Sequence, residues 1–395
     1  MSNDTQPEIR FPGFAEDWEE RKLSDVASIV GGGTPSTSNP EYWDGDIDWY
    51  APAEIGDQIY VNKSLKTITE LGQQKSSAKI LPIGTVLFTS RAGIGNTAIL
   101  AKEGTTNQGF QSIVPHENKL DSYFIFSRTH ELKRYGEVTG AGSTFAEVSG
   151  KQMAKMPILI PYIDEQRKIG AFFGQIDEAI ALHQRKLDLL KETKKGFLQK
   201  MFPKNGAKVP EIRFPGFTED WEQRELGEVV QITMGQSPNS ENYTENPRDH
   251  ILVQGNADMK NGRVVPRVWT TQVTKQAEKG DLILSVRAPV GDIGKTDYDV
   301  VLGRGVAAIK GNDFVFQQLG KMKENGFWSR FSTGSTFESI NSNDIREAII
   351  TIPNRVEQQL IGAFFRQIDD TIALHQRKLD LLKETKKGFL QKMFV

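Results

Sequence analysis

The chain has 395 residues, and its 49 Lys and Arg against 51 Asp and Glu give a formal net charge of −2. This length is enough for two or three domains, and the near-neutral charge by itself favours no nucleic-acid partner. The chain contains no cysteine, which excludes disulfides, thiolate metal sites and a cysteine nucleophile.

The first ten residues are polar and lack the apolar core of a secretory signal. No apolar run in the sequence is long enough to cross a bilayer as a helix. We therefore expect a cytoplasmic protein with no membrane partner.

An internal repeat begins near the start of the chain. The segment PEIRFPGF occurs at residues 7–14 and again at 210–217, and we call these two segments the FPGF motifs. A longer segment also occurs twice, at 165–202 and 357–394, and its two copies are identical over most of their length. The repetition predicts a tandem of two similar units, each with an FPGF motif, a variable globular part and a long terminal segment.

Both variable parts have the sequence pattern of mixed α/β structure. Apolar runs at Val86–Thr89 and Ile158–Ile160 predict strands in the first part, and Leu282–Ser285 and Ile349–Ile352 predict strands in the second. The loops between them are rich in Gly, Ser, Thr, Asn, Gln and aromatic residues, which suit hydrogen-bond recognition of another surface. Ordinary surface turns have the same composition, so both interpretations stay open.

The long repeated segments predict amphipathic helices. Their apolar residues alternate at spacings of four and three, which is a heptad seam. In the first copy the seam comprises Ile169, Phe173, Ile176, Ile180, Leu187, Leu190, Phe197 and Met201. In the second copy it comprises Ile361, Phe365, Ile368, Ile372, Leu379, Leu382, Phe389 and Met393. We expect Asp164 to cap the first helix, Pro203 and Gly206 to end it, and Asn354 with Glu357 to form a capping box for the second.

Two nearly identical apolar stripes predict that the helices pack on each other. A helix of some 37 residues is about 55 Å long and would leave its stripe exposed if it stood alone. An antiparallel pair would bury both stripes as a coiled coil inside one chain. The alternative is that each helix packs only on its own domain, as most amphipathic helices do.

Polar residues interrupt the seam at the same places in both copies, at His183 and Lys194 and at His375 and Lys386. We interpret the two histidines as polar seam residues that fix the register. Metal binding or a pH switch is the alternative role for histidines at such positions. The lysine-rich helix ends suit either contact with nucleic acid or a solvated face.

The sequence contains no familiar catalytic pattern. A phosphate-binding loop, a nucleophile elbow and an HExxH motif are all missing from the sequence, and the five histidines are scattered. Asn39–Tyr42 differs from the Asn-Pro-Pro-Tyr motif of adenine methyltransferases in its third residue, so we interpret it as a chance turn. We predict a non-catalytic chain that holds no metal and no cofactor.

Three features occur in duplicate and in one order: FPGF followed by EDW at 11–23 and 214–226, the long helices, and GSTF at 142–145 and 334–337. Over nearly the whole chain this arrangement resembles the specificity subunit of type I restriction–modification enzymes. The resemblance implies target recognition domains at 1–160 and 203–353 and helical spacers at 161–202 and 354–395.

The expected fold is therefore mixed α/β, with two similar target recognition domains joined by two long antiparallel helices in an intramolecular coiled coil of approximate two-fold symmetry. The resemblance also implies that each domain recognises one half of a split, asymmetric double-stranded DNA target. The implied protein partners are two adenine methyltransferase subunits, which use S-adenosylmethionine, and two restriction subunits, which use ATP and Mg²⁺. A scaffold that binds proteins through its coiled coil and never binds DNA is the alternative.

Residues shared by both units cannot discriminate between two different half-sites. We therefore assign shared polar residues to the framework or to phosphate contacts, namely Arg91, Ser143, Thr144, Arg287, Ser335 and Thr336. Base recognition is expected from Arg, Lys, Asn, Gln, hydroxyl and aromatic side chains where the units differ. In the first unit these are Thr34, Ser36, Asn39, Tyr42, Trp43, Asn96 and Gln108. In the second unit they are Gln236, Asn239, Tyr243, Asn256, Lys260, Arg263, Arg267 and Arg304.

Overall fold

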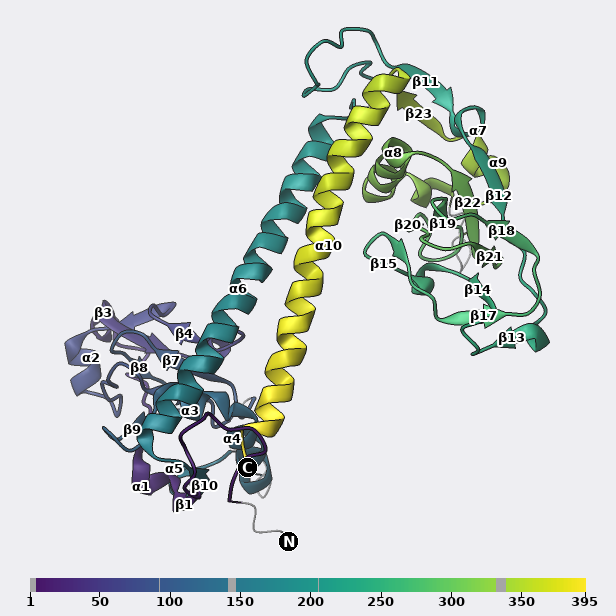
Figure 1. Cartoon of the computed structure of the whole chain (residues 1–395). Coiled ribbons are helices and arrows are strands. Elements are labelled where there is room, and N and C mark those ends of the chain that lie inside the picture. Colours follow the sequence, from purple (N-terminus) through teal and green to yellow (C-terminus); the bar gives the residue numbers. More distant parts are fainter. Residues whose placement is uncertain (1–4, 92, 141–146, 205, 332–338) are drawn as a thin grey trace. The chain divides into compact units, whose positions relative to one another are not determined.

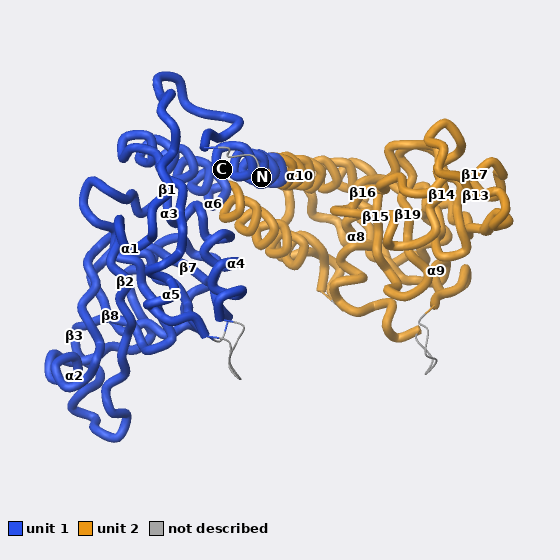
Figure 2. Tube along the Cα trace, turned by 90° about the horizontal axis from the view of Figure 1, so that it is seen from below, with its two compact units in different colours: residues 1–182, 379–395 blue, residues 183–378 orange. Residues whose placement is uncertain are grey.

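The computed structural model describes residues 5–91, 93–140, 147–204, 206–331 and 339–395 (Figure 1). The chain divides into two compact units, coloured separately in Figure 2. Unit 1 comprises residues 1–182 and 379–395, and unit 2 comprises residues 183–378. Within the described residues, no helix is both long enough and apolar enough to cross a bilayer.

Unit 1 contains a mainly antiparallel sheet in the order β2-β9-β6-β7-β4, in which only the β4–β7 pairing is parallel. A smaller sheet has the order β5-β3-β8, and β1 pairs with β10. The strands are β1 (Glu19–Lys22), β2 (Ala27–Gly31), β3 (Trp43–Tyr50), β4 (Tyr60–Val61), β5 (Lys66–Ile68), β6 (Val86–Phe88), β7 (Thr97–Leu100), β8 (Thr105–Thr106), β9 (Gln111–Pro115) and β10 (Pro157–Ile160). The helices are α1 (Leu23–Val26), η1 (Pro40–Tyr42), η2 (Pro52–Glu54), α2 (Glu70–Gln74), α3 (Ser122–Ser127), α4 (Thr129–Gly140), α5 (Gly150–Ala154) and α6 (Ile163–Lys200), and α6 continues into unit 2.

Unit 2 repeats this topology and extends it. Its main sheet has the order β12-β22-β19-β20-β16-β15, again with one parallel pairing, β16–β20. A second sheet has the order β13-β17-β14-β21-β18, and β11 pairs with β23. The strands are β11 (Glu222–Glu225), β12 (Gln231–Met234), β13 (Tyr243–Thr244), β14 (His250–Val253), β15 (Met259–Lys260), β16 (Arg263–Val264), β17 (Val268–Thr270), β18 (Lys275–Ala277), β19 (Leu282–Ser285), β20 (Ile293–Lys295), β21 (Val300–Leu302), β22 (Val306–Lys310) and β23 (Ile349–Ile352). The helices are α7 (Leu226–Val229), η3 (Ser240–Asn242), η4 (Asn256–Asp258), α8 (Asp313–Glu324), η5 (Trp328–Phe331), α9 (Ser342–Arg346) and α10 (Arg355–Lys392), whose last residues belong to unit 1.

The central strands β6 and β19 are apolar along most of their length because both faces of each sheet are covered. In β6, Val86 and Phe88 enter one core cluster and Leu87 enters another, as the alternation of side chains along a strand requires. In β19, Leu284 and Ile283 divide between two clusters in the same way. The predicted strands at these positions are confirmed, as are those at β10 and β23, with β6 one residue shorter and β10 one residue longer than expected.

The two long helices touch each other in both units. In unit 1, the rings of Phe172 on α6 and Phe389 on α10 lie 5.0 Å apart, edge to face. In unit 2, Phe197 on α6 and Phe364 on α10 make the same contact, also at 5.0 Å. Each unit thus pairs one end of α6 with the opposite end of α10.

Ion pairs satisfy the lysines that interrupt the seam. Lys386 on α10 binds Asp177 on α6 at 2.7 Å, and Lys194 on α6 binds Asp369 on α10 at 2.7 Å. Each aspartate also accepts a hydrogen bond from its own globular part, Asp177 from the Tyr123 hydroxyl at 2.9 Å and Asp369 from Gln317 at 2.7 Å. The same two carboxylates therefore join the helices to each other and to the domain beside them.

The FPGF motifs fasten the ends of both helices. Arg10 forms two 2.7 Å bonds to the Glu165 carboxylate at the start of α6, and the Ile9 amide donates to the Lys392 carbonyl at the end of α10. Arg213 binds Glu357 through two bonds of 2.7 and 2.9 Å in unit 2. The Ile212 amide donates to the Lys200 carbonyl.

The predicted cap at Asp164 is wrong. Helix α6 begins at Ile163, so Asp164 lies inside its first turn and faces Arg167 at 3.4 Å. Asn354 does cap α10, since its side-chain oxygen accepts from the Glu357 amide at 3.0 Å. The Glu357 carboxylate, expected to complete a capping box, binds Arg213 instead because that guanidinium supplies a stronger, charged partner.

Substituting Glu357 with Ala should destabilise the chain by about 3–5 kcal/mol, because it leaves Arg213 buried without its partner. In the native chain the hydrogen bonds that Arg213 donates to Glu357 raise the pKa of Arg213. An arginine stays protonated at neutral pH even without such a partner, so Arg213 in the variant cannot relieve the loss by deprotonation. Urea unfolding followed by tryptophan fluorescence measures the effect. Glu222→Ala is the matched control, since that carboxylate is 73% exposed and its pair with Arg224 should contribute less than about 1 kcal/mol. Equal losses in the two variants would contradict the role of the buried pair.

Lowering the pH should weaken the contact between His183 and His375, whose Nδ1 atoms lie 2.8 Å apart. Burial lowers the pKa of His375, and the nearby His183, Lys186 and Lys378 lower it further. Because the folded-state pKa lies below the unfolded value of about 6.5, stability is lost as pH falls below that value. We expect the thermal midpoint to fall more between pH 7.5 and 5.5 in the native chain than in a His183→Gln/His375→Gln variant. An equal fall in both would refute this.

Candidate nucleic-acid interface

In unit 1, the loop after β2 is fastened against the turn before β9. The Gly33 amide donates to the Thr106 carbonyl at 2.8 Å, and the Asn107 amide donates to the Tyr50 carbonyl at 3.0 Å. A Cβ on Gly32 would overlap the backbone oxygens of this turn, so only glycine permits the approach. We call residues 31–39 and 106–109 the loop pair of unit 1.

Unit 2 builds the same arrangement with different side chains. The Gln236 amide donates to the Leu302 carbonyl at 2.9 Å, and the Gly303 amide donates to the Val253 carbonyl at 2.7 Å. A Cβ on Gly235 would overlap the Gly303 carbonyl. Residues 234–239 and 302–305 are therefore the loop pair of unit 2.

The loop pair of unit 1 brings four of the predicted base-contacting residues together. The Thr34 hydroxyl donates to the side-chain oxygen of Gln108, and the Trp43 indole donates to the Ser36 carbonyl at 3.1 Å. The indole of Trp43 also lies edge-on to Trp49, at a centroid distance of 5.1 Å. These contacts hold a hydroxyl, an amide and an aromatic ring on one partly exposed surface.

The remaining candidates of unit 1 are Asn39, at the end of the loop pair, and Tyr42 and Asn96, outside it. The Asn39 side chain accepts from the Glu41 amide and caps η1, and Tyr42 lies in that short helix. Asn96 lies in the turn between β6 and β7, where its side-chain amide donates to the Ile55 carbonyl at 3.3 Å. Sequence comparison could not separate this turn from the loop pair.

Unit 2 divides its candidates between two groups. Gln236, Asn239 and Arg304 belong to the loop pair, and the Asn239 amide donates to Gln272 at 2.8 Å. Tyr243 follows directly, at the start of β13. The second group lies on and around η4, β15 and β16 and comprises Asn256, Lys260, Arg263 and Arg267.

Carboxylates engage both arginines of the second group. Arg263 pairs with Asp297 at 3.0 Å and with Asp370 at 3.6 Å. Arg267 pairs with Asp258 at 3.6 Å and donates to the Ala257 carbonyl at 2.9 Å. Their charges are therefore partly neutralised inside the unit.

The framework candidates occupy corresponding places. The backbone of Arg91 forms an isolated antiparallel β-bridge with Glu147, and the backbone of Arg287 forms one with Ser339. The Arg91 guanidinium also lies 4.0 Å from the Glu147 carboxylate, and Arg287 is exposed. The hydroxyl candidates in the GSTF segments lie outside the described residues; they are Ser143, Thr144, Ser335 and Thr336.

Sequence reasoning missed Ser237, whose hydroxyl oxygen accepts from the Arg304 amide at 3.0 Å. Ser237 corresponds to Thr34, because the fastened residues Gly33 and Gln236 directly precede them. A signal was present in the sequence: a glycine, a variable residue, a hydroxyl residue and a proline stand at 32–35 and again at 235–238.

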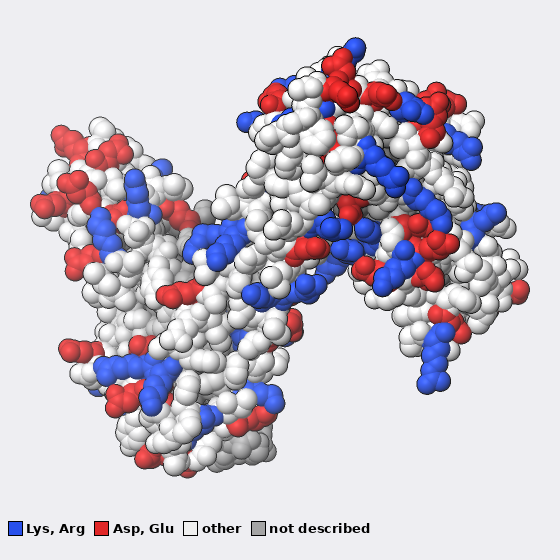
Figure 3. Space-filling model, turned by 45° about the horizontal axis from the view of Figure 1, so that its top comes forward, with Lys and Arg blue, Asp and Glu red and all other residues white. Residues whose placement is uncertain are grey.

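On the face shown in Figure 3, charge does not single out a DNA-facing surface. Figure 3 shows Lys and Arg mixed with Asp and Glu over the visible face. Burial raises the pKa of the Tyr50 hydroxyl, and the backbone carbonyl of Tyr50 accepts from the Asn107 amide of the loop pair. The candidate interface therefore rests on the loop pairs and their hydrogen-bonding groups.

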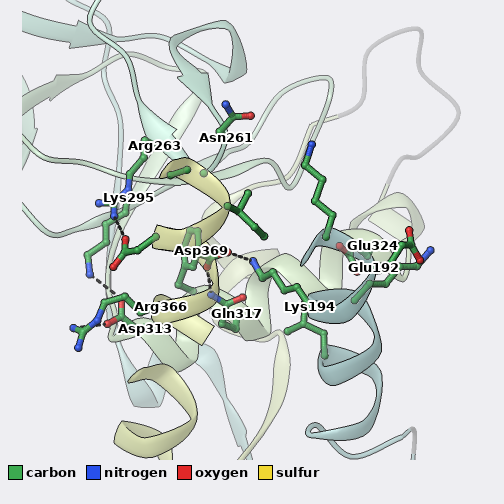
Figure 4. A pocket seen from close by; sticks show the side chains of 18 residues that line it. Glu192, Lys194, Asn261, Arg263, Lys295, Asp313, Gln317, Glu324, Arg366 and Asp369 are labelled. Atoms are coloured by element: carbon green, nitrogen blue, oxygen red, sulfur yellow. Dashed lines mark hydrogen bonds and ion pairs between the residues drawn. The ribbon is translucent and has the colours of Figure 1, made fainter. Parts of the chain in front are cut away.

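Unit 2 also contains a cavity of about 430 Å³ between α6, α8, α10 and the turn that precedes β16 (Figure 4). Lys194 is bound to Asp369, and Lys295 and Arg366 are bound to Asp313 at 2.8 and 3.3 Å, while Lys191 and Lys195 also line the cavity. A cavity beside α6 in unit 1 has an acidic lining instead, with Asp57, Asp121, Asp177 and Glu178.

No group of three or more potential metal-ligating His, Asp or Glu residues occurs among the residues that the structure describes.

The family model described as the type I restriction modification DNA specificity domain matches residues 15–192 and 218–384, which together cover more than half of the chain.

Curated relatives agree with this match. A type I restriction enzyme specificity subunit of Methanocaldococcus jannaschii is 28% identical over 407 residues, covering 95% of this chain and 92% of the relative. Another from the same organism, the MjaIX specificity subunit, is 32% identical over 248 residues, covering 59% of this chain and 56% of the relative. The crystal structure of the type I restriction-modification S subunit from M. genitalium shares the fold, with a TM-score of 0.69, 14% identity and 99% coverage of both chains.

Substituting Gly235 with Ala should displace the loop pair of unit 2, because the new Cβ meets the Gly303 backbone. We expect a loss of about 1–3 kcal/mol in the free energy of unfolding and faster hydrogen exchange at the Gln236 amide. Gly255→Ala is the control, because a Cβ on Gly255 would meet no neighbouring atom within 4 Å. Unchanged exchange at Gln236 in the Gly235 variant would show that the close approach is not required.

Proposed function

Because the chain belongs to the family of type I restriction–modification DNA specificity subunits, the non-catalytic components of these systems, we propose that it recognises a bipartite, asymmetric DNA sequence. Each unit would recognise one half-site. The observation that carries this proposal is the occurrence of the loop pair twice, on the same backbone hydrogen bonds and with different exposed side chains.

A recognition protein with two different targets needs this combination. A common frame presents side chains to the duplex in the same way in each unit, and differing side chains select different bases. Amide, hydroxyl and guanidinium groups in the loop pairs have the donors and acceptors that base edges require. The shared arginines, Arg91 and Arg287, are suited to phosphate contacts that position the protein without selecting sequence.

We further propose that α6 and α10 form an antiparallel intramolecular coiled coil with approximate two-fold symmetry. The matched ring contacts and the matched lysine–aspartate pairs support it. A stiff helical pair would hold the two recognition domains at a set separation. Proteins that read two half-sites from one side of a duplex need a spacing near one helical turn, about 34 Å.

The partners in this proposal are two adenine methyltransferase subunits, which bring S-adenosylmethionine, and two restriction subunits, which bring ATP and Mg²⁺. The chain itself would hold no cofactor and would act in the cytoplasm, where it reaches chromosomal DNA. Duplicated surfaces support the paired stoichiometry. Leu189 and Leu381 occupy the same place in the two identical helix segments, and each is 68% exposed.

Methylation sequencing of a host that expresses the chain with its methyltransferase subunit tests the proposal. We expect adenine methylation in one bipartite motif, lost when the gene for this chain is deleted. Replacing residues 1–150 with the corresponding domain of another family member should change one half of the motif and leave the other intact. Replacing residues 210–345 should change the opposite half. Methylation that does not depend on the chain would favour the protein-binding scaffold.

A further inference from the structure

We propose that Gln108 and Arg304 are corresponding specificity residues, with Gln108 selecting adenine in one half-site and Arg304 selecting guanine in the other. This inference rests on the proposed function and names the bases that the two loop pairs recognise. It follows from the position of the two residues, the surroundings of their side chains and the chemistry of base edges.

Backbone hydrogen bonds establish the correspondence. On one side of Gln108, the Asn107 amide donates to the Tyr50 carbonyl; on the other, the Gly109 carbonyl accepts from the Ser90 amide at 2.8 Å. Arg304 has the same two anchors. The Gly303 amide donates to the Val253 carbonyl, and the Gly305 carbonyl accepts from the Val286 amide at 2.9 Å. Each side chain therefore stands at the exposed centre of a turn that is fixed on both sides.

The Gln108 amide is oriented for adenine. The Thr34 hydroxyl donates to its Oε1 atom, which distinguishes the oxygen from the nitrogen and makes Thr34 a positioning residue. The oxygen keeps a second lone pair, and Nε2 keeps both hydrogens for other partners. Adenine presents an N6 donor beside an N7 acceptor in the major groove, and this pattern matches a glutamine amide.

Arg304 has the features expected for guanine. Among the residues that the structure describes, no carboxylate pairs with its exposed guanidinium, in contrast to Arg263 and Arg267. Its backbone is fixed by the bond from its amide to Ser237. A guanidinium fork matches the O6 and N7 acceptors of guanine, and it cannot match the donor on adenine N6.

Methylation sequencing of single-residue variants, in a host that carries the methyltransferase subunit, tests this inference. Gln108→Ala should relax one A·T pair in one half-site, and Gln108→Arg should shift that position towards G·C. Arg304→Ala should relax one G·C pair in the other half-site, and Arg304→Gln should shift it towards A·T. Gln74→Ala and Arg224→Ala, at exposed positions outside the loop pairs, are the controls and should leave the motif unchanged.

Competition binding by the complex of chain and methyltransferase measures the same effect as a ratio. The native complex should prefer the matched duplex over one substituted at the assigned position by about 5- to 150-fold, the range for one bidentate contact. Gln108→Ala or Arg304→Ala should abolish that preference and keep discrimination in the other half-site. Thr34→Val should reduce the preference at the Gln108 position, because the amide loses its orientation. If a variant loses all methylation in cells, the binding ratio still tests the assignment, because it measures the preference between two duplexes directly.

The outcomes separate this inference from the proposed function. If the native chain directs no bipartite methylation, the proposed function fails. If the native motif is bipartite but the Ala variants keep native preferences, or both variants alter the same half-site, only the assignment of Gln108 and Arg304 fails.

Discussion

Two buried Arg–Glu pairs organise this molecule. Arg10 with Glu165, and Arg213 with Glu357, bind in bidentate fashion where each long helix begins. Both carboxylates are almost fully enclosed, so each guanidinium provides the charge compensation that such a group requires. The neighbouring backbone bonds from Ile9 and Ile212 reach the end of the opposite helix. Each FPGF motif thus binds the start of one long helix and the end of the other.

The two units share their strand pairings and differ in the side chains that these strands and helices carry. The same strand pairings recur, including the parallel pairs β4–β7 and β16–β20. Asp177 and Asp369 both bind a lysine of the facing helix, yet the domain supplies Tyr123 in one unit and Gln317 in the other. The helix contacts have stayed constant while the adjoining domain surfaces have changed, which is the expected pattern when domains differ on a shared scaffold.

The sequence pattern was sufficient where periodicity or repetition carried the information. The heptad seam predicted the long helices and placed His183 and His375 on it as polar residues, but the contact between the two histidines is a finding of the structure. It could not predict that Glu357 binds Arg213 in preference to completing a capping box, because Arg213 lies far away in sequence. Asn96 and Gln108 looked equivalent as polar loop residues. Backbone bonds separate them: the Asn96 carbonyl accepts from the Thr89 amide within the turn between β6 and β7, whereas the residues on either side of Gln108 bond to Tyr50 and Ser90.

The turns around Gln108 and Arg304 are held by main-chain groups, which any residue supplies. A new side chain at position 108 removes at most the bond from Thr34, and one at position 304 removes none of the bonds that fix the turn. A single codon change can therefore alter the chemistry offered at these points while the polypeptide still folds. Binding preferences can therefore change by single substitutions at these two positions, and each intermediate protein still folds.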